Sequence, residues 1–391
     1  MGQNQNNRIN VFLFVILAAL SLSATFTAGY ATRAFADNGH GQLEGQYPIF
    51  GEVRQIMSRN FLGTLPDDKT LEYGLVHGWL SAVDDRYTIF LEPSAQELET
   101  QSLQGEFGGI GVNIRRNETG VIVLSPFPDM PAAFAGVIEG DILIAVDGNQ
   151  ITPETMTDEI SAWVRGPVDT EVKITIQRGG QTIEFVMKRQ VIEIPSVIGR
   201  ILEPDPTIGV VAVSRFSEKT PDEVQRTIDD LQAKSVTRIV LDLRGNGGGL
   251  LDSAVKTANL FLDGGVVMYE NRRDQAEKTY NAPGKGAEAD LPLVIIVNSG
   301  TASAAEILAG ALRDRGRGPL IGQTTFGKGS VQLIFTLSDG SSIHVTNAQW
   351  FTPSHTGIDG VGLKPDIAME PGAGGRDPEL DRAVAYLQNL P

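Results

Sequence analysis

Short apolar runs alternate with amphipathic runs through the second half of the chain. Ile208–Val213, Thr237–Leu243 and Leu291–Val297 have the length and composition of buried strands. The runs between them, Thr220–Lys234 and Leu251–Leu262, repeat apolar residues at helical spacing. This alternation predicts a layered α/β core.

The N-terminal part combines an apolar run with helical patterns. Arg8 precedes the run Val11–Leu22, and Ala34-Phe35-Ala36 fits a small-x-small cleavage site. Residues 1–36 are therefore predicted to be a signal peptide or a retained membrane anchor, and either alternative predicts an exported, periplasmic or extracytoplasmic protein. Residues 37–103 carry amphipathic helical stripes, which we expect to pack in a core. The first stripe consists of Phe50, Val53, Ile56 and Met57.

Residues 104–189 have the pattern of a separate module. A glycine-rich loop, Phe107–Val112, leads into a strand; a second strand, a short helix, further strands and a longer helix follow. This order resembles a PDZ domain, in which loop amides hold a chain-terminal carboxylate and the peptide adds a strand to the sheet. The alternative is that the glycines make only a tight turn. The residues expected to bind the peptide are Gly109, Ile110, Gly111, Val112 and, from the helix, Ile160.

Composition narrows the chemistry. The chain is 41% hydrophobic and 20% charged, which is typical of globular proteins, and its net charge of −16 argues against nucleic acid as a partner. With no cysteine, it has no disulfide, thiolate zinc site or cysteine nucleophile. None of the 4 histidines stands in a zinc-protease spacing, and those near the C-terminus lie in polar, turn-flanked settings that do not favour a Ser-His-Asp triad. We expect no metal and no cofactor.

Ser303 lies at a strand-to-helix corner, between the buried run Leu291–Val297 and the helical pattern Ala304–Leu312. Unpaired helix N–H groups and the positive end of the helix dipole favour an incipient alkoxide or oxyanion at this place. Ser303 is therefore a candidate nucleophile. The alternative is that its hydroxyl only caps the helix, since serine is a preferred N-cap residue.

Lys328 is the candidate base for this serine, because burial between two glycines and apolar neighbours would lower its pKa. The alternative is a solvated lysine in a turn. A third reading, a nucleotide-binding P-loop at Gly322–Lys328, fails because Gly329 replaces the magnesium-binding Ser or Thr and a strand pattern follows. The glycines of Gly247–Gly249 offer backbone N–H groups without side chains in the way.

Together these segments resemble the carboxyl-terminal processing proteases, serine proteases with a Ser/Lys dyad and an inserted PDZ domain. The segments that carry the resemblance are Asp242–Gly249, Gly300–Glu306, Gly322–Gln332, Phe351–Pro353 and Gly360–Asp366. By position, the resemblance implies Ser303 as nucleophile, Lys328 as general base, Gln332 as the residue that orients the lysine amine, and the amides of Gly249 and Ala304 as the oxyanion hole. Ala305 and the pair His355-Thr356 depart from the residues common in relatives.

The sequence therefore predicts a multidomain α/β protein. Its expected parts are a signal peptide or anchor in 1–36, an N-terminal helical region in 37–103, a PDZ-like β-sandwich or barrel in 104–189, a layered α/β protease core in 190–372 and a C-terminal helix in 373–391. The expected function is an exported serine endopeptidase that recognises the free C-termini of protein or peptide substrates. The alternative is a non-catalytic tail-binding protein on the same scaffold. The physiological substrate, the need for an adaptor and the oligomeric state, a homo-oligomer being one option, stay open.

Overall fold

The structure, a computed structural model, describes residues 47–117, 120–193, 195–203, 205–372 and 376–390. It has two compact units, which divide between Leu75 and Val76. The predicted signal peptide or anchor in residues 1–36 lies outside the described residues. Within the described ranges, no helix combines the length and the apolar composition that a membrane crossing requires.

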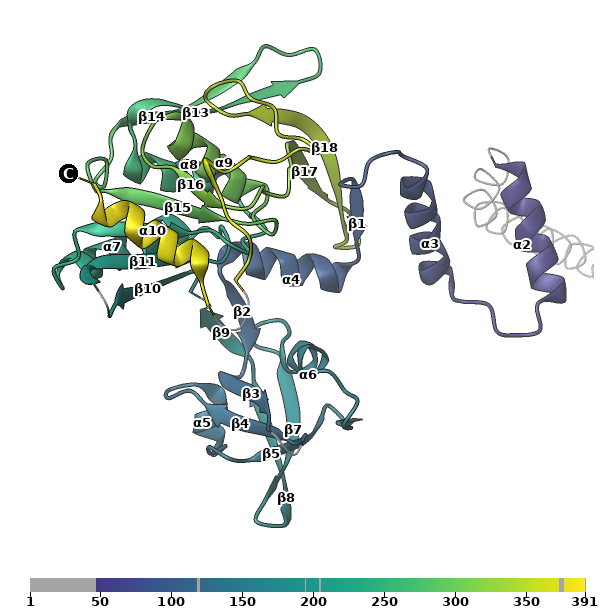
Figure 1. Cartoon of the computed structure of the whole chain (residues 1–391). Helices are drawn as coiled ribbons and strands as arrows, with labels where there is room; N and C mark the ends of the chain where they lie inside the picture. The colour runs from purple at the N-terminus through teal and green to yellow at the C-terminus, as the bar shows by residue number, and fades with distance from the viewer. Residues whose placement is uncertain (1–46, 118–119, 194, 204, 373–375, 391) are drawn as a thin grey trace, which may run out of the picture. The chain divides into compact units, whose positions relative to one another are not determined.

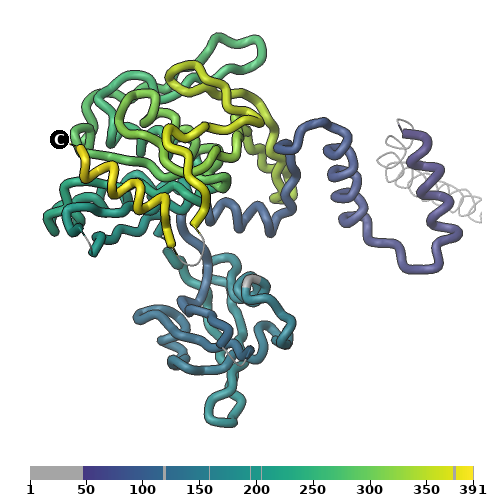
Figure 2. The backbone as a smooth tube through the Cα atoms, in the orientation of Figure 1, coloured from purple at the N-terminus to yellow at the C-terminus, as the bar shows by residue number. Residues whose placement is uncertain are grey.

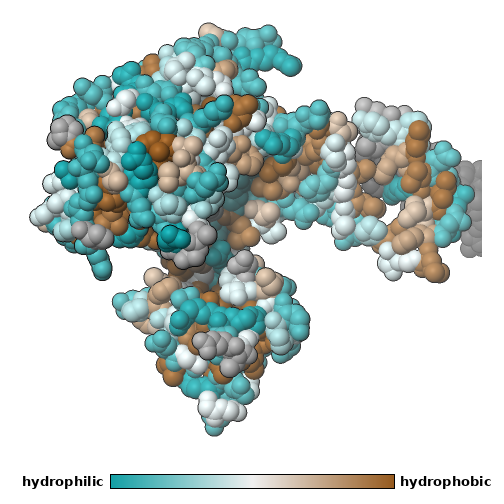
Figure 3. All heavy atoms as spheres, in the orientation of Figure 1, coloured by the Kyte–Doolittle hydropathy of each residue, from teal (hydrophilic) through white to brown (hydrophobic). Residues whose placement is uncertain are grey.

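The N-terminal helices are α2 (Pro48–Asn60) and α3 (Asp68–Ser81). Of the described residues of α2, none is buried, and Val53, Ile56 and Met57 are all exposed. Figure 3 shows apolar side chains on the surface of this part of the chain. The expectation that the stripe packs in a core is therefore wrong for the described residues. The pattern shows that α2 has an apolar face, but it does not show what that face contacts.

The PDZ-like module is built on a sheet with strand order β3-β4-β5-β7-β8, to which β6 adds beside β5. Its apolar core includes Ile110, Leu124, Ile160 and Ile174. The separate pair β2–β9 lies at the two ends of the module in sequence. The elements are β2 (Glu106–Gly109), β3 (Val112–Arg116), β4 (Ile122–Pro126), α5 (Pro131–Ala135), β5 (Ile142–Val146), β6 (Asn149–Gln150), α6 (Thr157–Val164), β7 (Glu171–Arg178), β8 (Gln181–Lys188) and β9 (Gln190–Glu193).

A second sheet, with order β10-β11-β12-β15-β16-β19, forms the centre of the α/β core. Its strands are parallel except β10, which pairs antiparallel with β11. The elements are β10 (Val197–Leu202), β11 (Asp205–Val213), α7 (Thr220–Gln232), β12 (Arg238–Asp242), α8 (Leu251–Phe261), β15 (Leu293–Val297), α9 (Ala304–Asp314), β16 (Leu320–Gly322), β19 (Ile367–Ala368) and α10 (Pro378–Gln388). The segment between β8 and β11 supplies β9, which pairs with β2, and β10, which begins this sheet.

Successive side chains of these strands face opposite layers, as strand geometry requires. On β12, Ile239 and Leu241 pack in the cluster that includes α7, α8 and α9, whereas Val240 packs in the cluster that includes α10. Figure 1 shows α10, in yellow, against one face of the sheet. The strands are therefore apolar on both faces, which explains their uninterrupted apolar runs.

A third, antiparallel sheet completes the core. Its order is β1-β18-β13-β14, and β17 also pairs with β18. The elements are β1 (Ile89–Leu91), β13 (Asp263–Arg272), β14 (Lys278–Lys285), β17 (Ser330–Thr336) and β18 (Ser342–Phe351), with helix α4 (Pro93–Gln104) following β1. Phe90 lies opposite Ile343, so residues far apart in sequence lie side by side (Figure 2). The predicted N-terminal helical region thus contains a strand of the core.

Candidate active site

Ser303 occupies the corner between β15 and α9. Its backbone has φ 54° and ψ −118°, a conformation that side-chain-bearing residues rarely adopt. The Ser303 carbonyl accepts a hydrogen bond from the Glu306 N–H at 2.8 Å, and the Ser303 N–H donates to the Glu306 carboxylate at 2.8 Å. The backbone of Ser303 carries both bonds. Strain of this kind, held in place by surrounding bonds, is typical of functional sites.

Glu306 ties the serine corner to the loop that carries Lys328. Its fully buried carboxylate also accepts hydrogen bonds from the N–H of Gly327 at 2.7 Å, the N–H of Lys328 at 2.9 Å and the hydroxyl of Thr325. No role for Glu306 was predicted from the sequence. The available signal was a Ser with Glu three residues later at the start of a helix, which is a capping box.

Lys328 is half-buried, and its Nζ donates to the Gln332 Oε1 at 2.7 Å. Burial lowers the pKa of the Lys328 ammonium, while the nearby charges of Glu99 and Asp85 oppose that shift. Gly327 has φ 86°, and a Cβ there would lie 2.7 Å from the Gly362 nitrogen. The close approach that brings Lys328 into the core therefore requires glycine at position 327.

The loop after β12 approaches Ser303 closely. Gly248 has φ 104°, and a Cβ on it would lie 2.8 Å from the Ser303 Cβ. Phe216 bonds to the Gly248 carbonyl and the Leu250 N–H, so the Gly249 N–H points away from this pairing. The Asn246 carbonyl accepts from the Ala302 N–H at 2.9 Å, which fixes the loop to the serine corner.

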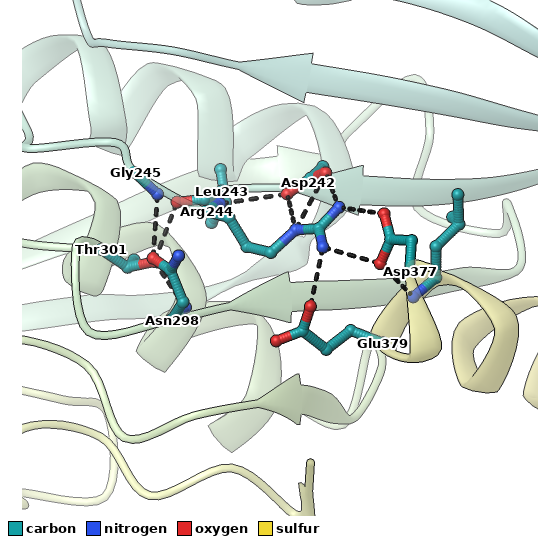
Figure 4. A network of polar contacts seen from close by, with 9 residues as sticks. Asp242, Leu243, Arg244, Gly245, Asn298, Thr301, Asp377 and Glu379 are labelled. Atoms are coloured by element: carbon teal, nitrogen blue, oxygen red, sulfur yellow. Dashed lines mark hydrogen bonds and ion pairs between the residues drawn. The ribbon is translucent and has the colours of Figure 1, made fainter. Parts of the chain in front are cut away.

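Arg244, at the start of the same loop, lies at the centre of an ion-pair network (Figure 4). Its guanidinium contacts both carboxylate oxygens of Asp242, both of Asp377 and one of Glu379, at 2.7–3.2 Å. Asp377 caps helix α10 through the Leu380 N–H. The network therefore joins the loop beside Ser303 to a helix much later in the chain.

One pocket of about 310 Å³ brings together the residues that the sequence analysis assigned to catalysis. Ser303, Lys328, Gln332, Gly249 and Ala304 all line it. Apolar side chains form much of the remaining wall, namely Leu103, Leu250, Leu251, Ile307, Val331, Ile334 and Trp350. Such a mixture of a few polar groups with apolar walls suits a peptide side chain beside a reactive group.

Two further polar side chains in this pocket were not predicted. Glu99 of α4 and the buried His344 of β18 line it, and their side chains lie 3.0 Å apart. The other C-terminal histidine, His355, instead stacks on Tyr269 and lies 3.3 Å from Glu277.

The PDZ-like module leaves β3 at the end of its sheet, and the glycine-rich loop precedes this strand. Gly111 has φ 69°, and a Cβ there would lie 2.2 Å from the Cβ of Met130. Ile110 and Ile160 are buried in the core of the module, at 1% and 0% exposure, rather than open on its surface. Their contact with a peptide, and that of Gly109 and Val112, stays a prediction.

Comparison with known proteins supports the interpretation of the α/β core as a peptidase and of the module before it as a PDZ domain. The profile of peptidase family S41 matches residues 207–369, and the PDZ domain profile matches residues 122–178. The class defined by fold and site is thus a PDZ-containing serine peptidase. The chain belongs to the carboxy-terminal processing protease family.

Individual relatives align along most of the chain. The carboxy-terminal-processing protease of Bartonella bacilliformis is 34% identical over 367 residues, which cover 92% of this chain and 82% of the relative. The carboxy-terminal processing protease CtpA of Bacillus subtilis is 31% identical over 373 residues, which cover 95% of this chain and 78% of the relative. The solved structure of a photosystem II D1 C-terminal processing protease is 31% identical, with a TM-score of 0.48, and covers 82% of this chain and 86% of its own.

Proposed function

We propose that this peptidase works by a Ser303/Lys328 dyad. The observation that carries the proposal is the Lys328–Gln332 pair: a half-buried amine with a lowered pKa, held at 2.7 Å in the pocket that Ser303 also lines. A lysine can act as a base only in the fraction of molecules in which its amine is neutral. Desolvation increases that fraction, because it lowers the pKa of the amine. Family membership makes the alternative, a tail-binding protein without catalysis, the weaker candidate.

In the proposed reaction, the Ser303 Oγ attacks the peptide carbonyl while the Lys328 Nζ takes its proton. The amides of Gly249 and Ala304 would then stabilise the oxyanion, a term of about 3 kcal/mol per donor. Lys328 returns the proton to the leaving amine, and water releases the acyl group from Ser303. The backbone conformation of Ser303 supports this role, because its φ and ψ lie outside the helical region and strain of this kind is typical of functional sites.

We further propose that the PDZ-like module captures substrate C-termini. The end position of β3 supports this function, because an edge strand can accept a peptide as an additional strand. The pattern of residues 1–36 supports export, with membrane association if that segment is retained.

The test compares the chain with its Ser303→Ala variant on an unfolded protein that ends in an apolar residue. Ser299→Ala is the matched control, because Ser299 is an exposed serine of the same loop. We expect cleavage by the unmodified chain and by the control only, and slower cleavage when the substrate's C-terminus is amidated. Cleavage by Ser303→Ala would refute the dyad, whereas equal cleavage of free and amidated substrates would refute tail capture alone.

A further inference from the structure

Gln332 has a second partner, which comes from a distant part of the chain. Its Oε1 accepts the bond from the Lys328 Nζ at 2.7 Å, and its Nε2 donates to the backbone carbonyl of Tyr87. A side-chain amide has one accepting end and one donating end. The Tyr87 carbonyl therefore determines which end faces the lysine. A reversed amide would present N–H groups to the amine and offer it no acceptor.

The ring of Tyr87 contacts the same amine. The Lys328 Nζ lies 5.0 Å from the ring centroid, within the range of a cation–π contact. The amine thus has the Gln332 oxygen as one neighbour and an aromatic ring as another. Tyr87 limits the position of Lys328 through both its backbone and its side chain.

The turn that presents Tyr87 is held by Asp85. The carboxylate of Asp85 accepts from the Tyr87 N–H at 3.0 Å and from the Thr88 hydroxyl at 2.6 Å. The Thr88 hydroxyl oxygen in turn accepts from the Thr346 N–H at 3.2 Å, which fixes the turn to β18. These bonds give the Tyr87 carbonyl a defined place relative to Gln332, which lies on the neighbouring strand β17.

We infer that the turn Asp85–Thr88 is a positioning element for the general base, acting on Lys328 through the Tyr87 carbonyl and Gln332. The inference rests on the proposed function, in which Lys328 takes the proton of Ser303. The turn lies outside residues 207–369, the range that matches the peptidase family. It contacts Gln332 and Lys328, and none of its four residues lines the pocket with Ser303, so its role is to position and not to react.

The turn also brings charge toward the lysine. Asp85 and Glu99 both favour the charged amine, the Glu99 carboxylate lies 3.0 Å from the His344 ring, and the ring of Tyr87 faces the Nζ. A variant that removes the charge of Asp85 therefore lowers the pKa of Lys328 even if the turn keeps its shape. The experiment must separate this electrostatic effect from the effect on position.

Asp85→Asn and Asp85→Ala make that separation in the full chain. Asparagine keeps an oxygen for the Tyr87 N–H but has no charge, whereas alanine removes both. Asp84→Ala is the matched control, since Asp84 is the exposed acidic neighbour of Asp85. The readouts are the pH profile of kcat, KM, and the reactivity of the Lys328 amine toward acetic anhydride at each pH, followed by mass spectrometry.

We expect both Asp85 variants to move the acid limb of kcat and the labelling midpoint of Lys328 to lower pH. Only Asp85→Ala should also lose plateau kcat, by about ten- to a hundredfold, with KM nearly unchanged. If Asp85→Ala keeps the plateau of Asp85→Asn, the positioning role is wrong. If Asp85→Ala does not fold, Thr88→Val tests the same point, because it keeps the charge of Asp85 and removes the hydroxyl that joins Asp85 to the Thr346 N–H. It should lower plateau kcat, and an unchanged plateau would overturn the inference.

Failure of the positioning role can be distinguished from failure of the Ser303/Lys328 dyad. A Lys328→Ala variant that cleaves peptides at the rate of the unmodified chain would refute the proposed function. A Lys328→Ala variant without activity, together with an Asp85→Ala variant that matches Asp84→Ala, would refute only the role of the turn.

Discussion

The carboxylate of Glu306 accepts a hydrogen bond from the backbone N–H of Lys328 at 2.9 Å. Glu306 stands in the first turn of the helix that begins directly after Ser303, and it also accepts from the Ser303 N–H. The proposed nucleophile and the proposed base are therefore fixed to one buried group, although neither of their side chains takes part in these bonds.

Glu306→Gln should damage both activity and stability. A glutamine has a single accepting oxygen, and its NH₂ group would face N–H donors that now meet a carboxylate. We expect kcat to fall about a hundredfold and the free energy of unfolding to fall by about 3 kcal/mol, the scale of a lost hydrogen bond to a charged group. Urea denaturation and peptide hydrolysis would measure the two effects. Glu218→Gln, at an exposed position, should change neither quantity.

Lys328→Arg should abolish base catalysis while it keeps the positive charge. A guanidinium stays protonated throughout the working range, so it cannot accept the proton of Ser303. We expect kcat to fall by about a thousandfold or more. Lys364→Arg, at an exposed lysine, is the control and should retain activity. Comparable rates for both variants would show that Lys328 is not the base.

Lys328→Met should stabilise the folded chain at neutral pH. Burial lowers the pKa of Lys328, so the folded state binds its proton less tightly than the unfolded state does. Below the pKa of Lys328 in the folded state, the full cost of burying the charged amine is present. The stability of the unmodified chain rises as the pH increases from that pKa to the ordinary lysine pKa of about 10.4. We expect the variant's Tm to exceed that of the unmodified chain by about 2 °C at pH 7, and the gain to vanish at high pH. A gain that grows with pH would contradict the lowered pKa.

Asp377→Asn should slow catalysis through the loop beside Ser303. The change removes one charge from the pair with Arg244 and leaves the end of that loop less firmly held. We expect kcat and the affinity for a peptide boronate to fall about tenfold together, since both depend on the oxyanion donors. Asp381→Asn, in the first turn of the same helix and exposed, should retain both values.

Gly111→Ala should impair tail recognition more than peptide-bond hydrolysis. Its new methyl group would lie 2.2 Å from the Met130 Cβ, so the loop before β3 must shift. Gly120→Ala shares the positive φ but has no heavy atom within 4 Å of the added carbon, which separates the clash from backbone strain. We expect only Gly111→Ala to weaken binding of a free C-terminal peptide by about tenfold or more, with short-peptide hydrolysis retained. Equal binding by both variants would argue against the loop as the tail site.

The sequence predicted the parts of the site that depend on local pattern. Ser303 and Lys328 each follow a recognisable strand or glycine signal, and the apolar runs of the central sheet have the length and composition of buried strands. The bond from Gln332 to Tyr87 spans 245 positions, and the pair Arg244–Asp377 spans 133. No periodicity connects residues so far apart, so these supports became visible only in the folded chain. The exposed stripe of α2 shows the same limit, because an amphipathic pattern does not name its partner.

The pairing of Arg244 with Asp377 gives the order of synthesis a consequence. A ribosome adds Ser303 and Lys328 to the growing chain well before it adds Asp377, so a nascent chain carries the proposed nucleophile while Arg244 has Asp242 as a partner but not yet Asp377 or Glu379. We expect such a chain to be a poor peptidase. A chain truncated after residue 372 should hydrolyse peptides only slowly until a segment with Asp377 and Glu379 is supplied. Activity would then appear only once the segment with Asp377 and Glu379 has been synthesised and has paired with Arg244.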